Sequence, residues 1–313
     1  MDSKDISLGK LTFQTDSCLA YLTLEKGLSD NSIVSYQNDL EQFASFCVKK
    51  LKRSNWLQVN SFDVSDWLYD LSEAGLSNST LCRKLSALRT FDTFLLRERV
   101  TVKSFMDLVS GPRLQRKAPE VLSISEMEKL LAVPDSSSPL DLRDRAILEL
   151  LYSSGLRVSE LCSLPLQMVD LEHGALKVLG KGSKERVVPI GGKALMSLKN
   201  YIDKGRPSIV KSNTGSALFI SRRGAPISRK TIWLMVVNAG KAACIEKPVK
   251  PHALRHSFAT HLLSGGADLR VIQELLGHAD IATTQIYAAV DAARVVSAHE
   301  EHHPRSQGDA DIL

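Results

Sequence analysis

Three histidines and an arginine interrupt an otherwise apolar stretch, PHALRHSFATHLLSGG, at residues 251–266. On a helix that begins at its proline and ends at its glycine pair, His252 and Arg255 would share one face of the first turn. A helix N-terminus presents unpaired N–H groups and positive potential, and a guanidinium can hold two phosphate oxygens at once. The stretch therefore suits an anion site, although a buried helix end paired with carboxylates would use the same residues. The buried side of the helix would be formed by Leu254, Phe258, Leu262 and Leu263.

Zinc is the first alternative for this stretch, because His252 and His256 are four residues apart and could share a helix face. The glutamate of an H-E-x-x-H motif is absent, however, and His256 would point away from the partner face of Arg255. The five cysteines are widely spaced and form no C-x-x-C pair, which indicates neither a zinc cluster nor a disulfide framework. We therefore expect no metal and no cofactor, and we assign His256 and His261 to packing.

Four further residues have the type and context of a phosphate-handling site, but each also has an ordinary explanation. Arg157 follows a glycine in SSGLRVSEL and could simply pair with Glu160, whereas Lys181 in GKG could be a solvated turn lysine. His278 in LLGH could cap a helix, and Tyr287 could be a core tyrosine. A tyrosine oxygen can hold phosphate covalently if positive charge or a base removes its proton, whose reference pKa is about 10.

The elements that must position these residues are helices and one hairpin. SISEMEKLLAV and DLRDRAILELLYSSG have helical periodicity, and the first opens with a capping box at Ser123 and Glu126. In ALKVLGKGSKERVVPI, Leu176 and Val178 alternate with their neighbours before a glycine-containing turn. This pattern predicts a β-hairpin with Lys181 at its tip.

Residues 13–109 are expected to be helical throughout. SNSTLCRKLSALRTFDTFLLRER predicts a helix that begins near Ser77. Its buried stripe is predicted to be Leu81, Leu85, Leu88, Phe91 and Leu95. Off that stripe lie Arg83, Ser86 and Arg89, with Lys84 beside them. These residues form either a solvated face or one that follows the phosphates of a nucleic acid.

The stretch SGPRLQRKAPEVLS breaks the helical pattern with a glycine and two prolines among three basic residues. We therefore expect an N-terminal domain at residues 1–110, a linker at 111–119 and a second domain with a C-terminal tail at 120–313. A length of 313 residues suits two domains. The expected fold class is mainly α, and the second domain is expected to be mixed α/β, mostly helical, with a small antiparallel sheet.

Composition limits the partners and the compartment. A formal net charge of +5 and a pI near 8.9 permit a polyanionic partner without requiring one. The first thirty residues show no basic segment leading into an apolar run, so no secretory signal is visible. No stretch of about 18 apolar residues occurs. We expect a cytosolic protein with no membrane contact.

Taken together, the motifs resemble the catalytic domain of the tyrosine recombinase (phage integrase) family. G-L-R-x-x-E-L around Arg157, G-K-G around Lys181, H-x-L-R-H-x-x-A-T-x-L from His252, L-G-H ending at His278, and then Tyr287 occur in the family's order and at similar spacing. YLTLEKGLSDNSIVSYQNDL and the HHPR near the C-terminus extend the resemblance to the XerC and XerD branch, with the XerD pattern the more similar.

The resemblance implies a SAM-like N-terminal core-binding domain and a site-specific DNA recombinase that forms a 3′-phosphotyrosine intermediate. The implied catalytic set is Arg157, Lys181, His252, Arg255, His278 and Tyr287. The tyrosine would be the nucleophile, and the two arginines would clamp the non-bridging phosphate oxygens. The two histidines would donate hydrogen bonds to the same oxygens, with His252 also handling the tyrosine proton. The lysine would protonate the departing 5′ oxygen.

The resemblance also implies partners. The first is double-stranded DNA with a two-half-site target, which the two domains would enclose as a clamp. The second is a sister recombinase, or further copies of this chain, in a tetramer. The third is an FtsK-type translocase. The C-terminal segment would dock on a neighbouring protomer. The expected DNA-binding residues are Arg83, Lys84, Arg89, Arg222, Arg223, Arg229 and Lys230. We assign no role to residues 306–313.

The leading interpretation is a recombinase that resolves chromosome dimers. A mobile-element integrase of the same family is an alternative, although no additional arm-binding domain precedes residue 13. A DNA-binding architectural protein with an inactive catalytic set is another. A type IB topoisomerase would also trap DNA covalently, but it would relax supercoils without needing a specific sequence.

Overall fold

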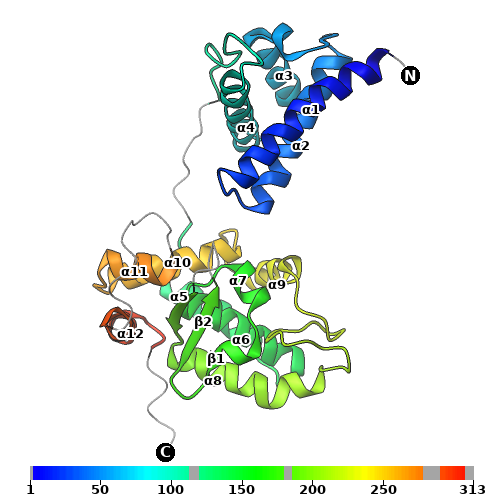
Figure 1. Ribbon diagram of the computed structural model, residues 1–313. Coiled ribbons are helices and arrows are strands. Elements are labelled where there is room, and N and C mark those ends of the chain that lie inside the picture. The colour runs from blue at the N-terminus through cyan, green and yellow to red at the C-terminus, as the bar shows by residue number, and fades with distance from the viewer. Residues whose placement is uncertain (1–2, 113–119, 180–184, 278–289, 307–313) are drawn as a thin grey trace, which may run out of the picture. The chain divides into compact units, whose positions relative to one another are not determined.

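The computed structural model describes residues 3–112, 120–179, 185–277 and 290–306, with side chains from residue 11 in the first range and from residue 296 in the last (Figure 1). The chain divides into two compact units, Met1–Lys117 and Ala118–Leu313. Most of the predicted linker, residues 113–119, lies outside the described residues. No described helix is both long enough and apolar enough to cross a membrane.

The N-terminal unit is helical in its described part. Its elements are α1 (Ser3–Leu24), α2 (Asp30–Lys49), the 3₁₀ turn Trp56–Gln58, α3 (Ser61–Glu73) and α4 (Asn78–Arg97). Local signals set several of the starts. Asn60 and Asp63 form a capping box before α3, and the Ser77 hydroxyl accepts a hydrogen bond from the backbone N–H of Thr80 before α4. The predicted start near Ser77 is confirmed.

The core of this unit is an aromatic cluster at the meeting of α2, α3 and α4. The predicted stripe of α4 is confirmed, since all five of its residues are buried. The Trp56 ring meets Phe91 edge-on, with centroids 4.7 Å apart, and it lies 6.1 Å from Phe43. The indole N–H of Trp56 donates to the Leu11 carbonyl at 3.2 Å, which joins α1 to the cluster.

Lys84 corrects one sequence-based expectation. Its side chain is 4% exposed, and its ammonium donates to Asp39 at 2.8 Å and to Gln42 at 2.6 Å, both on α2. The ammonium also lies 5.4 Å from the centroid of the Trp67 ring. Lys84 therefore ties α4 to α2 and has no exposed surface to offer DNA, so its assignment as a DNA-binding residue is wrong.

The C-terminal unit contains one small sheet among helices. Its described helices of six or more residues are α5 (Ile124–Ala132), α6 (Pro139–Ser153), α7 (Val158–Ser163), α8 (Gly192–Asn200), α9 (Arg229–Ala242), α10 (Pro251–Ser264), α11 (Leu269–Leu276) and α12 (Val290–His302). The strands are β1 (Val169–Asp170), β2 (Ala175–Leu179) and β3 (Glu185–Pro189), antiparallel in the order β1-β2-β3. The predicted hairpin is confirmed, with Leu176 opposite Val188 and Leu179 opposite Glu185. The capping box at Ser123 and Glu126 is also present.

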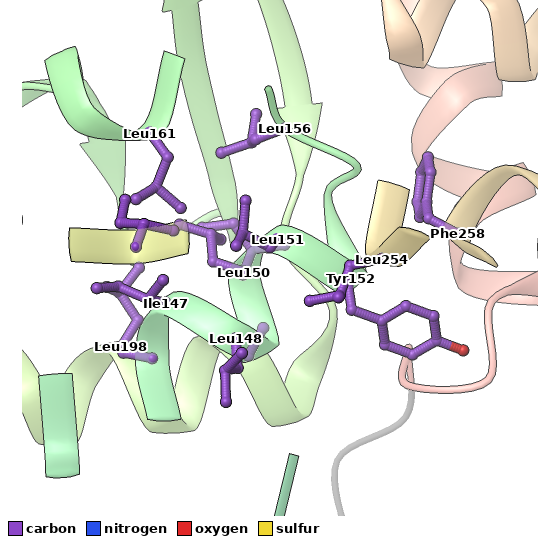
Figure 2. Packing of buried hydrophobic residues seen from close by; sticks show 14 of the residues in the cluster. Ile147, Leu148, Leu150, Leu151, Tyr152, Leu156, Leu161, Leu198, Leu254 and Phe258 are labelled. Carbon is purple, nitrogen blue, oxygen red and sulfur yellow. The ribbon is translucent and has the colours of Figure 1, made fainter. Parts of the chain in front are cut away.

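Helix α6 lies at the centre of this unit, which explains its nearly unbroken apolar run. Ile147, Leu150 and Leu151 pack with residues of α7 and α8, and Tyr152 lies beside Leu254 and Phe258 of α10 (Figure 2). Directly after α6, Gly155 has a φ of +56°, and a Cβ there would come within 2.4 Å of the Phe258 ring. Only glycine fits both the backbone conformation and the space. This tight turn places Arg157 at the start of α7.

The predicted helix at residues 251–264 is confirmed as α10, including its proline start and glycine end. Leu254, Phe258 and Leu262 are fully buried, as predicted. Leu263 is 51% exposed, so its predicted place on the buried side is wrong. It follows the fully buried Leu262 in the last turn and lies about 100° further round the helix, on the side that faces solvent.

Candidate active site

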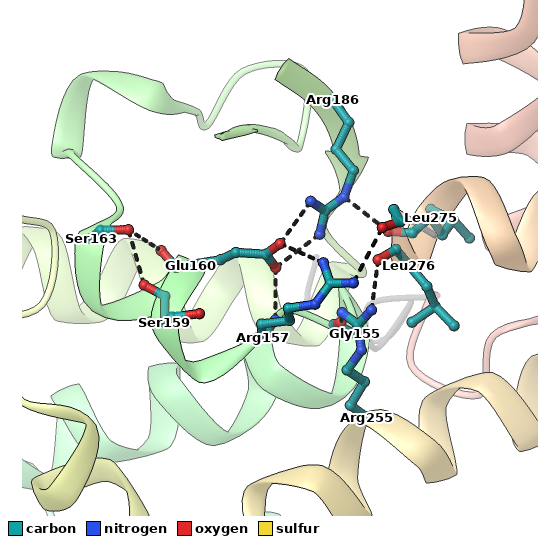
Figure 3. A network of polar contacts seen from close by, with 10 residues as sticks. Gly155, Arg157, Ser159, Glu160, Ser163, Arg186, Arg255, Leu275 and Leu276 are labelled. Atoms are coloured by element: carbon teal, nitrogen blue, oxygen red, sulfur yellow. Dashed lines mark hydrogen bonds and ion pairs between the residues drawn. The ribbon is translucent and has the colours of Figure 1, made fainter. Parts of the chain in front are cut away.

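Three arginines converge on the C-terminal end of α11 (Figure 3). They come from separate parts of the unit: Arg157 from the start of α7, Arg186 from β3 and Arg255 from α10. The bonds run from Arg186 Nε to the Leu275 carbonyl at 3.1 Å, from Arg255 Nη2 to the Leu276 carbonyl at 2.6 Å, and from Arg157 Nη2 to the Gly277 carbonyl at 3.2 Å. A helix C-terminus carries partial negative charge and carbonyls without intrahelical partners, so it suits these cations.

Glu160 holds two of the arginines together. Its Oε1 accepts from Arg157 Nη1 and Arg186 Nη1, both at 2.9 Å. Its Oε2 accepts from Arg186 Nη2 at 2.9 Å and from the backbone N–H of Arg157 at 2.8 Å. Burial alone would raise the pKa of Glu160, but the hydrogen bonds from Arg186 and Arg157 outweigh it and hold the pKa below its usual range. The carboxylate is therefore ionised at neutral pH.

Arg255 is half-buried. Its Nη1 donates to the Gly155 carbonyl, so the tight turn after α6 also holds this side chain. Burial, followed by the positive charge of Arg157, lowers the pKa of Arg255 to about 10. It remains a cation at neutral pH. Arg157 and Arg186 share the carboxylate of Glu160, and Arg255 donates only to carbonyls, so positive charge exceeds negative charge among the described residues of the cluster and favours a bound anion.

The histidines of α10 take different positions. His252 is exposed in the first turn, with its side chain open to a ligand. His256 is half-buried. His261 Nδ1 is hydrogen-bonded to the Tyr152 hydroxyl at 2.8 Å, and burial lowers its pKa. This contact confirms the packing interpretation of His261.

Three of the predicted catalytic residues, Lys181, His278 and Tyr287, lie outside the described residues. The structure thus brings together Arg157 and Arg255, with His252 on the same helix as Arg255. In sequence, His278 directly follows Gly277, whose carbonyl accepts the bond from Arg157. Lys181 lies in the segment between β2 and β3.

The predicted DNA-binding residues other than Lys84 are exposed. On α4, Arg83 contacts Asp39 with part of its guanidinium, and Arg89 Nη2 lies 3.4 Å from the Val109 carbonyl. In the C-terminal unit the exposed residues are Arg222, Arg223, Arg229 and Lys230. The last two begin α9, whose N-terminus is capped by the Ser228 hydroxyl. Exposure permits contacts with DNA, and the assignment of these residues stays a prediction.

Arg186 is the member of the cluster that sequence reasoning missed. It lies in ERVVP, where alternation along a strand places it on the same face as the buried Val188. A charged residue on the inward face of a strand needs a buried counter-charge. That signal was available in the sequence, but Glu160 lies 26 residues earlier and nothing local identifies it as the partner.

The C-terminal segment packs against its own unit in this structure. Arg305 forms an ion pair with the buried Glu149 of α6, with an Nε to Oε2 distance of 3.1 Å. His299 Nε2 lies 2.7 Å from the Ser153 carbonyl at the end of α6. The docking on a neighbouring protomer expected from the sequence stays a prediction.

Lowering the pH is expected to release the C-terminal segment from α6. The rings of His299 and His303 stack 4.8 Å apart and are almost fully buried, and burial lowers the pKa of both. Because the docked state favours neutral imidazoles, their contribution is complete above the ordinary histidine pKa of about 6.5 and is lost as pH falls below it. The groups that face them include Tyr152, His261, Glu300 and Arg305.

Hydrogen exchange of the amides of residues 296–306 tests this expectation between pH 7.5 and pH 5.5, after correction for intrinsic exchange rates. The opening equilibrium should rise by up to about tenfold per pH unit for each histidine that gains a proton. A His299→Gln variant should lose part of the pH dependence, whereas His173→Gln, at an exposed site, should keep all of it. Equal protection at both pH values would contradict the expectation.

Comparison with known proteins gives consistent matches over most of the chain. Residues 120–294 match the pattern described as the Phage integrase family, and residues 16–99 match its N-terminal SAM-like domain. The chain is 40% identical over 297 residues to tyrosine recombinase XerD of Oceanobacillus iheyensis, covering 95% of this chain and 100% of that protein. It is 44% identical over 298 residues to tyrosine recombinase XerD of Pseudomonas putida, covering 93% and 97%.

Solved structures share the fold. The XerH site-specific recombinase bound to a palindromic difH substrate aligns with a TM-score of 0.66 at 24% identity, covering 95% of this chain and 94% of that one. The Tn1549 transposon integrase in complex with transposon right end DNA aligns with a TM-score of 0.68 at 20% identity, covering 89% and 96%. The mostly helical architecture with a SAM-like domain and a small antiparallel sheet is therefore shared with these proteins.

Proposed function

The chain belongs to the phage integrase family of tyrosine recombinases, and from this premise we propose that it cuts and rejoins DNA at specific sites through a 3′-phosphotyrosine intermediate. The observation that carries the proposal is the convergence of Arg157 and Arg255. They are far apart in sequence, yet both donate to neighbouring carbonyls at the end of α11. This geometry supports a shared phosphate site, because each guanidinium has five N–H donors and not all are used by the protein.

The proposed reaction begins with Tyr287. Its phenolic oxygen attacks the scissile phosphorus, and His252 accepts the phenolic proton. As the tyrosine–phosphorus bond forms, the bond between phosphorus and the 5′ oxygen breaks, and Lys181 gives that oxygen a proton. Attack by a 5′-hydroxyl from the other DNA strand reverses these steps and releases the tyrosine.

The arginines would act on the pentacoordinate transition state. Negative charge grows there on the non-bridging oxygens, and donors already in position stabilise it without reorganising at the moment of reaction. The contacts of Arg157 with Gly277 and of Arg255 with Gly155 supply that preorganisation. His278 would add a hydrogen bond to the same oxygens.

The proposed partners follow from the relatives. XerD-type relatives suggest a sister recombinase, a two-half-site DNA target and resolution of chromosome dimers, with four protomers in the active assembly. An FtsK-type translocase is the proposed regulator. The exposed arginines of α4 and the basic start of α9 would contact the DNA backbone, which predicts affinity that falls steeply with salt.

A covalent trapping experiment tests the reaction. DNA bound by the protein in its host is recovered and sequenced, and a nicked half-site that cannot be religated is built from it. The wild type should give a protein–DNA adduct on a denaturing gel, and Tyr287→Phe should give none. Tyr69→Phe, at an exposed tyrosine of the N-terminal unit, is the matched control and should give the adduct in full. Absence of an adduct from the wild type on its own bound site would overturn the proposal.

A further inference from the structure

The Arg186 side chain makes three hydrogen bonds in the described part of the site, whereas the side chains of Arg157 and Arg255 make two each. Its planar fork spans both oxygens of Glu160 at 2.9 Å, and its Nε reaches the Leu275 carbonyl at 3.1 Å. The side chain is 14% exposed. Gly277, which ends α11 with a φ of +63°, lies so close that a Cβ there would meet the guanidinium at 3.1 Å. Arg186 is thus enclosed by the carboxylate and by the end of α11.

The position of Arg186 determines how far Glu160 neutralises the positive charge of Arg157. The carboxylate of Glu160 carries one negative charge, and its Oε1 accepts from Arg157 and from Arg186 at the same distance, 2.9 Å. With Arg186 present, neither cation is fully neutralised by that carboxylate. Without it, Glu160 would face Arg157 alone, and a buried one-to-one ion pair would attract Arg157 more strongly and reduce its field at a nearby phosphate.

The same residue connects three parts of the site. Arg186 is the second residue of β3, the strand that follows the segment containing Lys181. Its bonds to Glu160 and Leu275 therefore tie β3 to α7 and to the end of α11. Loss of the side chain would remove the bonds of β3 to both elements at once, while the Arg157–Gly277 bond would still join α7 to the end of α11.

We propose, on the basis of the function proposed above, that Arg186 is a positioning residue for DNA cleavage, which balances the charge of Glu160 and holds the end of α11 so that Arg157 stays available to the scissile phosphate. In this role it touches neither the DNA nor the tyrosine. The competing explanation is an ion pair that only stabilises the fold, and the two differ in what removal of Glu160 should do.

The test uses single-turnover adduct formation on the nicked half-site with the full-length chain. Arg186→Gln should lower the cleavage rate by about 10–100-fold, the range found when a partner that orients a metal-binding side chain is lost. Half-site Kd should change by less than about threefold, because binding rests on many phosphate contacts. Arg145→Gln, at an exposed arginine of α6, is the matched control and should cleave at the wild-type rate.

The double variant separates charge balance from simple stability. In Glu160→Gln/Arg186→Gln both charges are gone, so Arg157 is no longer neutralised, and cleavage should recover by about tenfold relative to Arg186→Gln. A half-site with a neutral methylphosphonate at the scissile position should likewise reduce the defect of Arg186→Gln. Thermal melting of every variant shows whether it is folded. Arg186→Lys keeps the positive charge and provides a folded comparison, in which the loss of cleavage rate should be smaller than in Arg186→Gln.

Three outcomes would overturn the inference without touching the proposed function. They are wild-type cleavage by Arg186→Gln, a double variant that cleaves no faster than Arg186→Gln while both melt like the wild type, and Arg186→Lys losing as much activity as Arg186→Gln. Failure of the wild type to form any adduct would instead remove the proposed function itself.

Discussion

Replacing Arg255 by lysine is expected to lower the rate of covalent adduct formation by about 10²–10³-fold, the usual cost of losing one preorganised donor to a developing oxyanion. The guanidinium binds the Gly155 and Leu276 carbonyls with separate nitrogens and has further N–H groups for phosphate. A lysine ammonium is a single point of charge that cannot meet this geometry. Single-turnover cleavage of the nicked half-site measures the loss.

Arg145→Lys is the matched control for this substitution, because Arg145 is an exposed arginine on α6. It should cleave like the wild type. Half-site Kd measured by gel shift should change little in Arg255→Lys, so that the loss lies in the chemical step. A variant that cleaves within threefold of the wild type would show that Arg255 is not part of the phosphate site.

Replacing Asp39 by alanine is expected to destabilise the N-terminal unit by about 3–5 kcal/mol, because it leaves the buried Lys84 ammonium without a counter-charge. Asp39 is 1% exposed and accepts from Lys84 and Arg83. Urea unfolding of the full chain should show the N-terminal transition moving to lower concentration. In a Trp233→Phe background, the remaining tryptophans, Trp56 and Trp67, both report on this unit.

Lys84→Met is the matched comparison for Asp39→Ala. It removes the ammonium, keeps an apolar side chain of similar length over the Trp67 ring, and leaves Asp39 with Arg83 as a partner. Its loss of stability should be less than half that of Asp39→Ala. Equal effects of the two substitutions would show that the unpaired charge is not what determines the cost.

Features that depend on near neighbours could be predicted from the sequence. The bounds of α10 follow from its proline and glycines, and the stripe of α4 follows from its periodicity. The inward position of Lys84 could not be predicted, because it depends on Asp39, which lies 45 residues earlier on another helix. The same holds for Arg305, whose partner Glu149 is 156 residues away.

The candidate site was predicted in its residue types but not in its internal connections. Family resemblance identified Arg157 and Arg255, and the structure places both at the end of α11. The sequence suggested Glu160 only as a simple neighbour of Arg157, whereas the carboxylate also holds Arg186. A network of this kind depends on three elements meeting in space, which no local pattern records.

The end of α11 affects the stage at which the guanidinium groups of the site lose their bound water. Its carbonyls bind all three guanidinium groups, and those of Arg186 and Arg255 lose part of their hydration when the unit folds, whereas the Arg157 side chain stays 38% exposed. A phosphate that binds the remaining N–H groups of Arg157 and Arg255 then has less water to displace than it would from fully hydrated cations. Folding therefore meets part of the desolvation cost in advance, and the helix end keeps the guanidinium groups in place for the substrate.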